Sequence, residues 1–96
     1  MQIKFVTPST RTSRLVADVE LHFELELPGL KLVGFKLWRK PGPSSRDEYY
    51  VTLPSRAFNK GHERGYFDYL RSAREHYEDT DGIRQEIIDA YKDNRQ

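Results

Sequence analysis

The stretch 15-LVADVELHFELEL-27 decides the fold class, because it is the longest alternating segment of the chain. Every odd position from 15 to 27 is apolar, whereas five of the six even positions carry Asp, Glu or His. A period of two is typical of a β-strand with one buried face and one solvent-exposed face. The stretch therefore predicts a long strand whose exposed face is acidic.

Shorter segments on either side of this stretch predict further strands. Gln2–Val6 precedes it across a turn rich in Ser, Thr and Pro, and 30–40 follows it across a Pro-Gly turn. The apolar phase of 30–40 slips beside Gly34, which indicates a β-bulge, because glycine tolerates the backbone that a bulge requires. A further strand, 48–54, ends at a proline.

The chain closes with a predicted helix over 82–94. Thr80 or Asp81 can cap it. Its apolar residues recur at helical spacing, at Ile83, Ile87, Ala90 and Tyr91. The segment 66–70 is compatible with strand or helix, and its aromatic residues favour a strand. Strands first and a helix last predict an α+β fold: an antiparallel sheet of about four strands followed by a C-terminal amphipathic helix.

Length and composition limit the class of protein. The 96 residues are expected to form a single domain, 1–96, because a chain of this length closes one modest core, and a dimer would bury more apolar surface. The absence of cysteine excludes a disulfide framework and suits a reducing cytoplasm, so a cytoplasmic location is expected. No apolar run approaches the length of a membrane span, so no membrane partner is expected.

The net charge of +1 is arranged in blocks along the chain. Residues 15–27 carry four acids and no base, and 28–46 carry five bases and no acid. Residues 55–74 carry five Lys or Arg against two acids. Two interpretations stay open: the blocks pair across neighbouring strands, or they form separate surfaces that select a partner.

Catalysis is not predicted. His22 lies on the acidic face of its strand, and His62 with Glu63 could form an acid–base pair that lacks a nucleophile and a converging third group. The histidines, including His76, show no spacing typical of a metal site, and NKGHERG matches no nucleotide-binding fingerprint. We therefore expect no enzyme, no catalytic residue, no metal, no cofactor and no small-molecule substrate.

The segment 55–65 is predicted to be a loop that binds nucleic acid. Guanidinium groups bind phosphates in bidentate geometry, glycines let a backbone approach a polyanion, and aromatic faces stack on exposed bases. Alternatively, the neighbouring aromatic residues belong to the core and the basic residues are merely solvated around a connector. The residues assigned to nucleic-acid contact are Ser55, Arg56, Lys60, Arg64, Arg71 and Arg74.

A second basic strip follows the strand 30–40. It contains Lys31, Lys36, Arg39 and Lys40. A period of two places Lys36, Trp38 and Lys40 on one face, where Trp38 could stack on a base, pack on a neighbour or fill a dimer interface.

Four segments in this order, VGFKLWR, YVTLPSR, FD and IRQEIIDAY, resemble the SpoVG family of bacterial sporulation or septation regulators. The opening strands on either side of the Ser/Thr-rich turn fit the same pattern. The resemblance implies a small cytoplasmic homodimer that pairs through strands and binds DNA, in some cases RNA. It assigns nucleic-acid contact most directly to Arg56, in the motif Pro54-Ser55-Arg56. Two departures stand out: Ala57 replaces a second basic residue, and Phe67 stands where members can carry Arg.

These observations together predict a non-enzymatic, homodimeric nucleic-acid-binding regulator, with DNA ahead of RNA. The alternative is a protein–protein interaction module without nucleic-acid binding, which uses a sheet edge and the Trp38 face.

Overall fold

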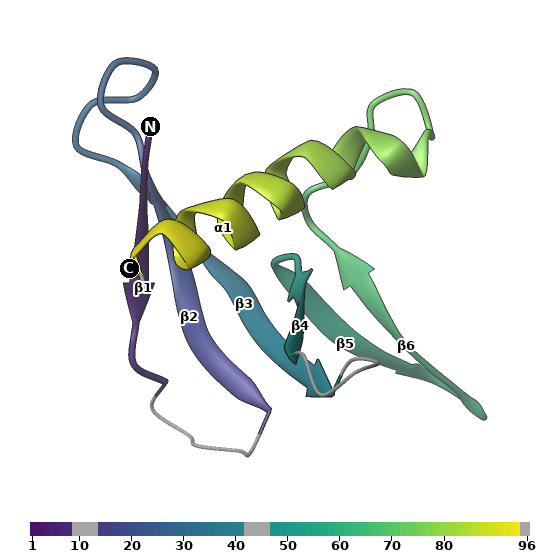
Figure 1. The fold of residues 1–96 in the computed structure, drawn as a ribbon. Helices are drawn as coiled ribbons and strands as arrows, with labels where there is room; N and C mark the ends of the chain where they lie inside the picture. The colour runs from purple at the N-terminus through teal and green to yellow at the C-terminus, as the bar shows by residue number, and fades with distance from the viewer. Residues whose placement is uncertain (9–13, 42–46, 95–96) are drawn as a thin grey trace.

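The structure is a computed structural model that describes residues 1–8, 14–41 and 47–94 (Figure 1). Four strands form one antiparallel sheet in the order β1-β2-β3-β4, and two more strands form a separate antiparallel hairpin. This confirms the predicted α+β fold and adds a second small sheet. The elements are β1 (Gln2–Val6), β2 (Leu15–His22), β3 (Lys31–Pro41), β4 (Asp47–Thr52), β5 (Ser55–Lys60), β6 (Glu63–Asp68), the 3₁₀ turn η2 (Tyr77–Thr80) and α1 (Asp81–Asn94).

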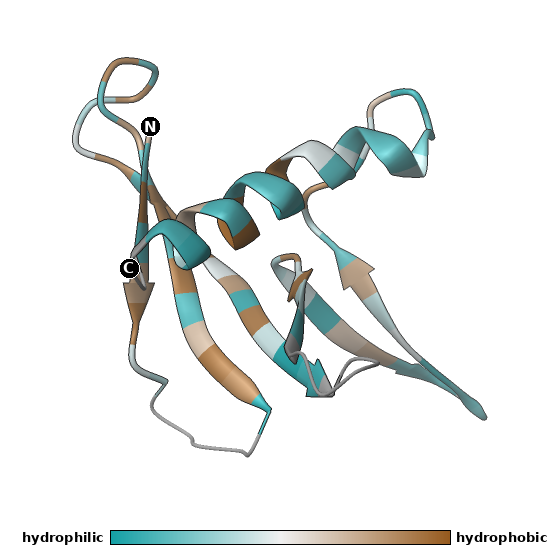
Figure 2. Cartoon of the chain, viewed as in Figure 1, coloured by the Kyte–Doolittle hydropathy of each residue, from teal (hydrophilic) through white to brown (hydrophobic). Residues whose placement is uncertain are grey.

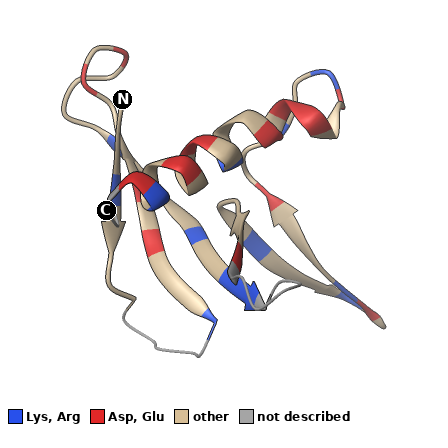
Figure 3. Ribbon diagram, in the orientation of Figure 1, with Lys and Arg blue, Asp and Glu red and all other residues tan. Residues whose placement is uncertain are grey.

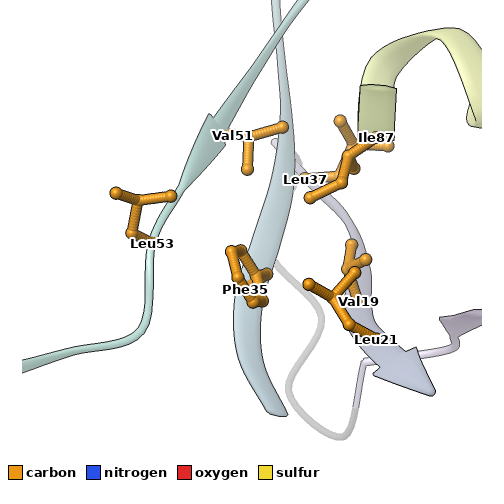
Figure 4. Close-up of a cluster of buried hydrophobic side chains, with 7 residues drawn as sticks. All are labelled: Val19, Leu21, Phe35, Leu37, Val51, Leu53 and Ile87. Atoms are coloured by element: carbon orange, nitrogen blue, oxygen red, sulfur yellow. The ribbon is translucent and has the colours of Figure 1, made fainter. Parts of the chain in front are cut away.

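Helix α1 crosses one face of the four-stranded sheet, and the core lies between them (Figures 1 and 4). Along β2, apolar and polar residues alternate as the sequence predicts (Figure 2). Ile87 of α1 is fully buried, and Phe35 and Leu37 of β3 are buried beneath it. The buried residues are Ala17, Val19, Leu21, Phe35, Leu37, Val51, Leu53 and Ile87.

The predicted bulge beside Gly34 is confirmed. Val19 pairs with Phe35, but Leu21 pairs with Leu32, so β3 contains one residue more than β2 over this interval. Gly34 has φ 106°, and a Cβ built on it would lie 3.1 Å from the Cβ of Pro54. Glycine is therefore required both by the backbone conformation and by the close approach of the chain that leaves β4.

The strand predicted over 15–27 ends at His22, and the prediction is wrong beyond it. The Phe23 amide donates to the carbonyl of Leu30 at 3.0 Å, and the Leu30 amide donates to that of Leu27 at 3.1 Å, which closes a connection between β2 and β3. Leu25 is 90% exposed, so the alternation there no longer reflects burial. The predicted turn between β1 and β2 falls largely on residues 9–13, which lie outside the described residues.

The predicted loop over 55–65 is also wrong, because this segment forms most of the β5–β6 hairpin. Only Gly61 and His62 connect the two strands, and Gly61 has φ 62°, the positive φ that a Gly-X hairpin turn needs at its first loop position. Every residue of β5 is exposed. Because neither face of this strand is buried, its sequence shows no apolar alternation, and the segment was predicted as a loop. The hairpin extends away from the four-stranded sheet (Figure 1).

Candidate nucleic-acid interface

The strand register divides the hairpin into two faces. Arg56 is opposite Phe67, Phe58 is opposite Gly65, and directly opposite residues of an antiparallel pair project to the same side. A Cβ on Gly65 would lie 2.8 Å from the Phe58 ring, which confirms that the ring covers this glycine. We call this side, formed by Arg56, Phe58, Lys60 and Phe67, the basic-aromatic face; it also carries one acid, Glu63, opposite Lys60.

The predicted contact residues of the hairpin are split between these faces. Arg56 and Lys60 lie on the basic-aromatic face, whereas Ser55 and Arg64 project from the opposite side, next to Asp68 and Asn59 respectively. The structure thus brings together only part of the predicted set. The sequence could not reveal this division, because the segment was predicted as a loop.

Phe67 organises the basic-aromatic face. The guanidinium carbon of Arg71 lies 4.3 Å from the centroid of its ring, and that of Arg56 lies 5.4 Å from it. Tyr69 meets Phe67 edge-on, with ring centroids 6.4 Å apart. Cation–π contacts of this kind hold arginines in place while leaving their N–H groups available to an anion.

The neighbouring aromatic residues are not part of the core, so the alternative interpretation of this segment is wrong on that point. Phe67 is 37% exposed, and the other three rings are more exposed still. Exposed rings amid cations provide surface on which bases can stack. The three are Phe58, Tyr66 and Tyr69.

Four of the six predicted contact residues are exposed cations that are available to bind an anion. Arg56, Lys60, Arg64 and Arg71 are exposed, and none of them forms an ion pair with another residue that the structure describes. Glu63 lies opposite Lys60 in the register, so the cations without a nearby described acid on this face are Arg56 and Arg71 around the ring of Phe67. Exposed cations around an apolar ring form the type of surface that attracts a polyanion.

Arg74 has a different environment. Its Nη2 contacts Oδ1 of Asp79, and its Nε donates to Oδ2 of the same carboxylate at 3.0 Å. The Ser72 hydroxyl also donates to Asp79, at 2.6 Å, and accepts the amides of Arg74 and His76. This clasp of Ser72, Arg74 and Asp79 orders the segment between β6 and α1, so Arg74 already has a structural partner.

The clasp shifts the pKa values of its charged members. Hydrogen bonds from Arg74 first, and from Ser72 second, hold the pKa of the Asp79 carboxyl below its usual value. The same carboxylate raises the pKa of Arg74. Both groups are therefore stabilised in their charged forms.

The second basic strip is divided between the two sheet faces: Arg39 is opposite Tyr49 on the side of α1, whereas the three lysines lie on the other face and are paired with acids. Lys36 contacts Asp18 at 2.7 Å across β2 and β3, and the neighbouring Lys31 contacts Glu20 at 3.2 Å. Lys40 contacts Glu48 at 3.8 Å. Pairing between the acidic and basic blocks is thus confirmed here, whereas the basic residues of the hairpin have no ion pair with a described residue. Figure 3 shows where the basic and acidic residues lie along the strands.

Glu20 is the centre of a small ionic cluster on this face. It accepts from His22 at 2.9 Å as well as from Lys31. These hydrogen bonds, with that of His22 the larger, hold the pKa of Glu20 below its usual value. His22 is therefore part of a surface ionic cluster on β2.

Trp38 lies on this same face, as the period of two predicts. Its indole Nε1–H donates to Oγ1 of Thr52 at 2.8 Å, and its ring stacks on Tyr50 with a centroid distance of 6.2 Å and an interplanar angle of 10°. Lys36 and Lys40 share the face, opposite Thr52 and Glu48 in the register.

An open groove of about 930 Å³ lies where the hairpin meets the start of α1. Its walls combine largely exposed tyrosines with cations. One of the lining residues, Arg84, has a buried Nε without a hydrogen-bond partner among the described residues. The groove was not predicted from the sequence. One indication of it was Tyr77, an aromatic residue in the polar segment REHYEDT, where no apolar periodicity accounts for its presence. The residues that matter below are Tyr66, Tyr69, Arg71, Tyr77 and Arg84.

No metal site and no membrane partner were predicted from the sequence. Among the described residues, no three His, Cys, Asp or Glu side chains gather in a way that could hold a metal ion. His62 lies in the hairpin turn and His76 faces Glu78 at 3.3 Å. Over the same described ranges, no helix has the length and apolar character needed to cross a bilayer.

No family model, curated protein or solved structure matches this chain with significance.

Proposed function

We propose that the chain is a non-enzymatic, homodimeric regulator that binds nucleic acid, DNA in preference to RNA, in the cytoplasm. The observation that carries this proposal is the arrangement of Arg56 and Arg71 around the exposed ring of Phe67 on a projecting hairpin. The resemblance of the motifs to the SpoVG family supports the same function. Arg56 is supported as a contact residue both by the motif Pro54-Ser55-Arg56 and by its position opposite Phe67.

The proposed contacts follow from charge and accessibility. A phosphate backbone along the basic-aromatic face meets Arg56 and Lys60, with Arg71 beside them, and no described carboxylate has to be displaced from an ion pair. Ser55 and Arg64 serve as secondary contacts from the opposite side. Arg74 would have to leave Asp79 to take part, so we assign it to ordering the connection to α1.

A homodimer is proposed because the hairpin is poorly supported within one chain. A two-stranded hairpin alone is at best marginally stable in water, and neither β5 nor β6 pairs with the four-stranded sheet. The radius of gyration is 14.8 Å, compared with about 12.5 Å for a compact domain of this length. Light scattering tests this part: we expect twice the monomer mass at micromolar concentration, and a monomer would contradict it.

The experiment that tests binding is a salt series on labelled DNA and RNA, followed by fluorescence anisotropy. Displacement of condensed counterions makes such binding strongly salt-dependent. We expect retention at low salt and a steep loss of affinity as the salt concentration rises. Absence of binding to duplex and single strands at low salt would refute the proposal.

A second candidate function is protein docking through the sheet face that carries Trp38. The lysines on this face are already paired with acids, and the stack of Trp38 and Tyr50 offers aromatic surface with its indole donor satisfied. Such a surface suits a protein partner better than a polyanion. Loss of a co-purifying protein in Trp38→Ala, with nucleic-acid affinity unchanged, would favour this candidate.

A further inference from the structure

The groove between the hairpin and α1 continues the basic-aromatic face. Phe67 belongs to both, and Arg71, which lies against its ring, lines the groove, so a chain that follows the face reaches the groove without crossing another surface. The groove is wide and open, and the residues that surround it come from β6, from the segment after it and from the first turn of α1.

Three tyrosines in the walls of the groove are largely exposed to solvent, so packing in the core does not account for them. Tyr77 is 92% exposed, Tyr66 77% and Tyr69 61%. In a duplex the bases are already stacked on one another, so aromatic faces have little access to them. Unpaired bases, in contrast, stack on exposed aromatic side chains whatever their sequence.

Two arginines border the same groove. Arg71 lies against Phe67, and its planar guanidinium can itself stack on a base or bind a phosphate. Arg84 has only a 3.4 Å contact with Asp81, and its buried Nε has no described acceptor. Because Nε is shielded from solvent, a ligand in the groove would be bound by the terminal nitrogens of the Arg84 guanidinium. Asp68 and Glu75 also line the groove, which disfavours a dense duplex backbone there more than a single strand.

We propose that this groove binds single-stranded nucleic acid, with unpaired bases stacked on Tyr69 and Tyr77 and the backbone held by Arg71 and Arg84. The inference rests on the proposed function, because the strand enters along the basic-aromatic face. It specifies that function: the ligand is an unpaired DNA or RNA segment, and the groove adds Tyr69, Tyr77 and Arg84 to the contacts.

The test measures the anisotropy of three labelled probes at low salt: oligothymidylate, oligouridylate and a DNA duplex of the same length. A length of about twelve nucleotides falls within the range of compact single-strand sites. The protein variants are Tyr69→Ala and Tyr77→Ala, with Tyr50→Ala as the control. Tyr50 is an exposed tyrosine on the far face of the sheet. Thermal unfolding verifies that each variant is folded, and Tyr77, at 92% exposure, contributes little to packing.

We expect single strands to bind about tenfold more tightly than the duplex, and each groove variant to lose about fivefold or more of single-strand affinity. The groove variants should leave duplex affinity unchanged within about twofold, and Tyr50→Ala should behave as the wild type. Oligothymidylate and oligouridylate separate DNA from RNA as the source of the strand. A duplex bound as tightly as the single strands, or folded groove variants with wild-type affinity, would overturn the inference while binding itself stands. Failure to bind any probe would instead refute the proposed function.

Discussion

The guanidinium carbon of Arg71 lies 4.3 Å from the centroid of the Phe67 ring. Arg71 follows β6 and Arg56 lies in β5, yet both are held against the same ring, because Phe67 is directly opposite Arg56. The ring therefore fixes two cations from different parts of the chain on one exposed surface.

Phe67→Leu should weaken nucleic-acid binding without unfolding the protein. The substitution removes two cation–π contacts worth about 0.5–1 kcal/mol each at exposed sites, so affinity should fall several-fold. Fluorescence anisotropy measures the affinity, and circular dichroism confirms the fold. The control is Tyr50→Leu, which removes an exposed ring on the far face of the sheet that no arginine contacts in the described structure. Equal affinity for Phe67→Leu and the wild type would show that the ring does not position the arginines.

Gly34→Ala should destabilise the four-stranded sheet. Alanine is strained at φ 106°, and its Cβ would lie 3.1 Å from that of Pro54. We expect a loss of about 1–3 kcal/mol in the free energy of unfolding. Urea unfolding measures this loss. Gly82→Ala is the control, since nothing lies within 4 Å of its added Cβ and alanine favours a helix by up to about 1 kcal/mol. Similar stabilities for the two variants would argue against the strained bulge.

Ile87→Ala should remove the main contact of α1 with the sheet. Ile87 is the fully buried helix residue of the core, and truncation of such a side chain costs about 2–5 kcal/mol. The loss should appear in urea unfolding as a lower midpoint. Leu25→Ala, at a side chain 90% exposed, should change stability by less than about 0.5 kcal/mol. If the two truncations proved equally mild, α1 would not pack on the sheet as described.

The clasp of Ser72, Arg74 and Asp79 should make local stability depend on pH. Arg74 lowers the pKa of Asp79 in the folded state, so the Asp79 carboxylate stabilises the fold fully above about pH 4, the ordinary Asp range. This stabilisation is lost as the pH falls through the lower, folded-state pKa. Asp79→Asn should therefore lower the unfolding temperature at neutral pH, and the difference from wild type should disappear in strong acid.

The control for this variant is Glu86→Gln, an exposed carboxylate of α1 without an ion pair to a described residue. Scanning calorimetry across a pH series provides the comparison. A wild-type unfolding temperature for Asp79→Asn at neutral pH, or a difference that persists unchanged in acid, would contradict the stabilising role of the clasp.

Burial determined how much of the fold could be predicted from the sequence. Ala17, Val19 and Leu21 face the core, so their period of two was visible, and the same holds for the helical period of Ile83 and Ile87. The hairpin has no buried face, so the run of six exposed residues in β5 left no apolar period and was predicted as a loop. The alternation beyond His22 persisted in the sequence although the chain turns there.

The candidate site was predictable only in part, because it depends on register and on contacts distant in the sequence. Arg56 was predicted from a sequence motif, but the face that it shares with Lys60 became visible only from the strand pairing. The same pairing decides which lysines meet acids, as Lys36 meets Asp18. The groove could not be predicted, since it forms only where β6 approaches the start of α1.

The central claim is that the hairpin is the nucleic-acid-binding surface, and one comparison of charge-matched variants tests it most directly. Arg56→Ala/Lys60→Ala/Arg71→Ala removes three cations without described ion pairs, and Lys31→Ala/Lys36→Ala/Lys40→Ala removes three paired ones from the sheet face. Both variants lose the same net charge, so general electrostatic attraction falls equally in the two proteins.

Anisotropy of a labelled oligothymidylate over a salt series gives the affinity and the slope of log K against log salt. We predict that the hairpin variant loses most of its affinity and that its slope falls by about 2, at roughly 0.7 for each lost phosphate contact on a single strand. The sheet-face variant should keep a slope close to that of the wild type. Equal affinities and equal slopes for the two variants would contradict the assignment of binding to the hairpin.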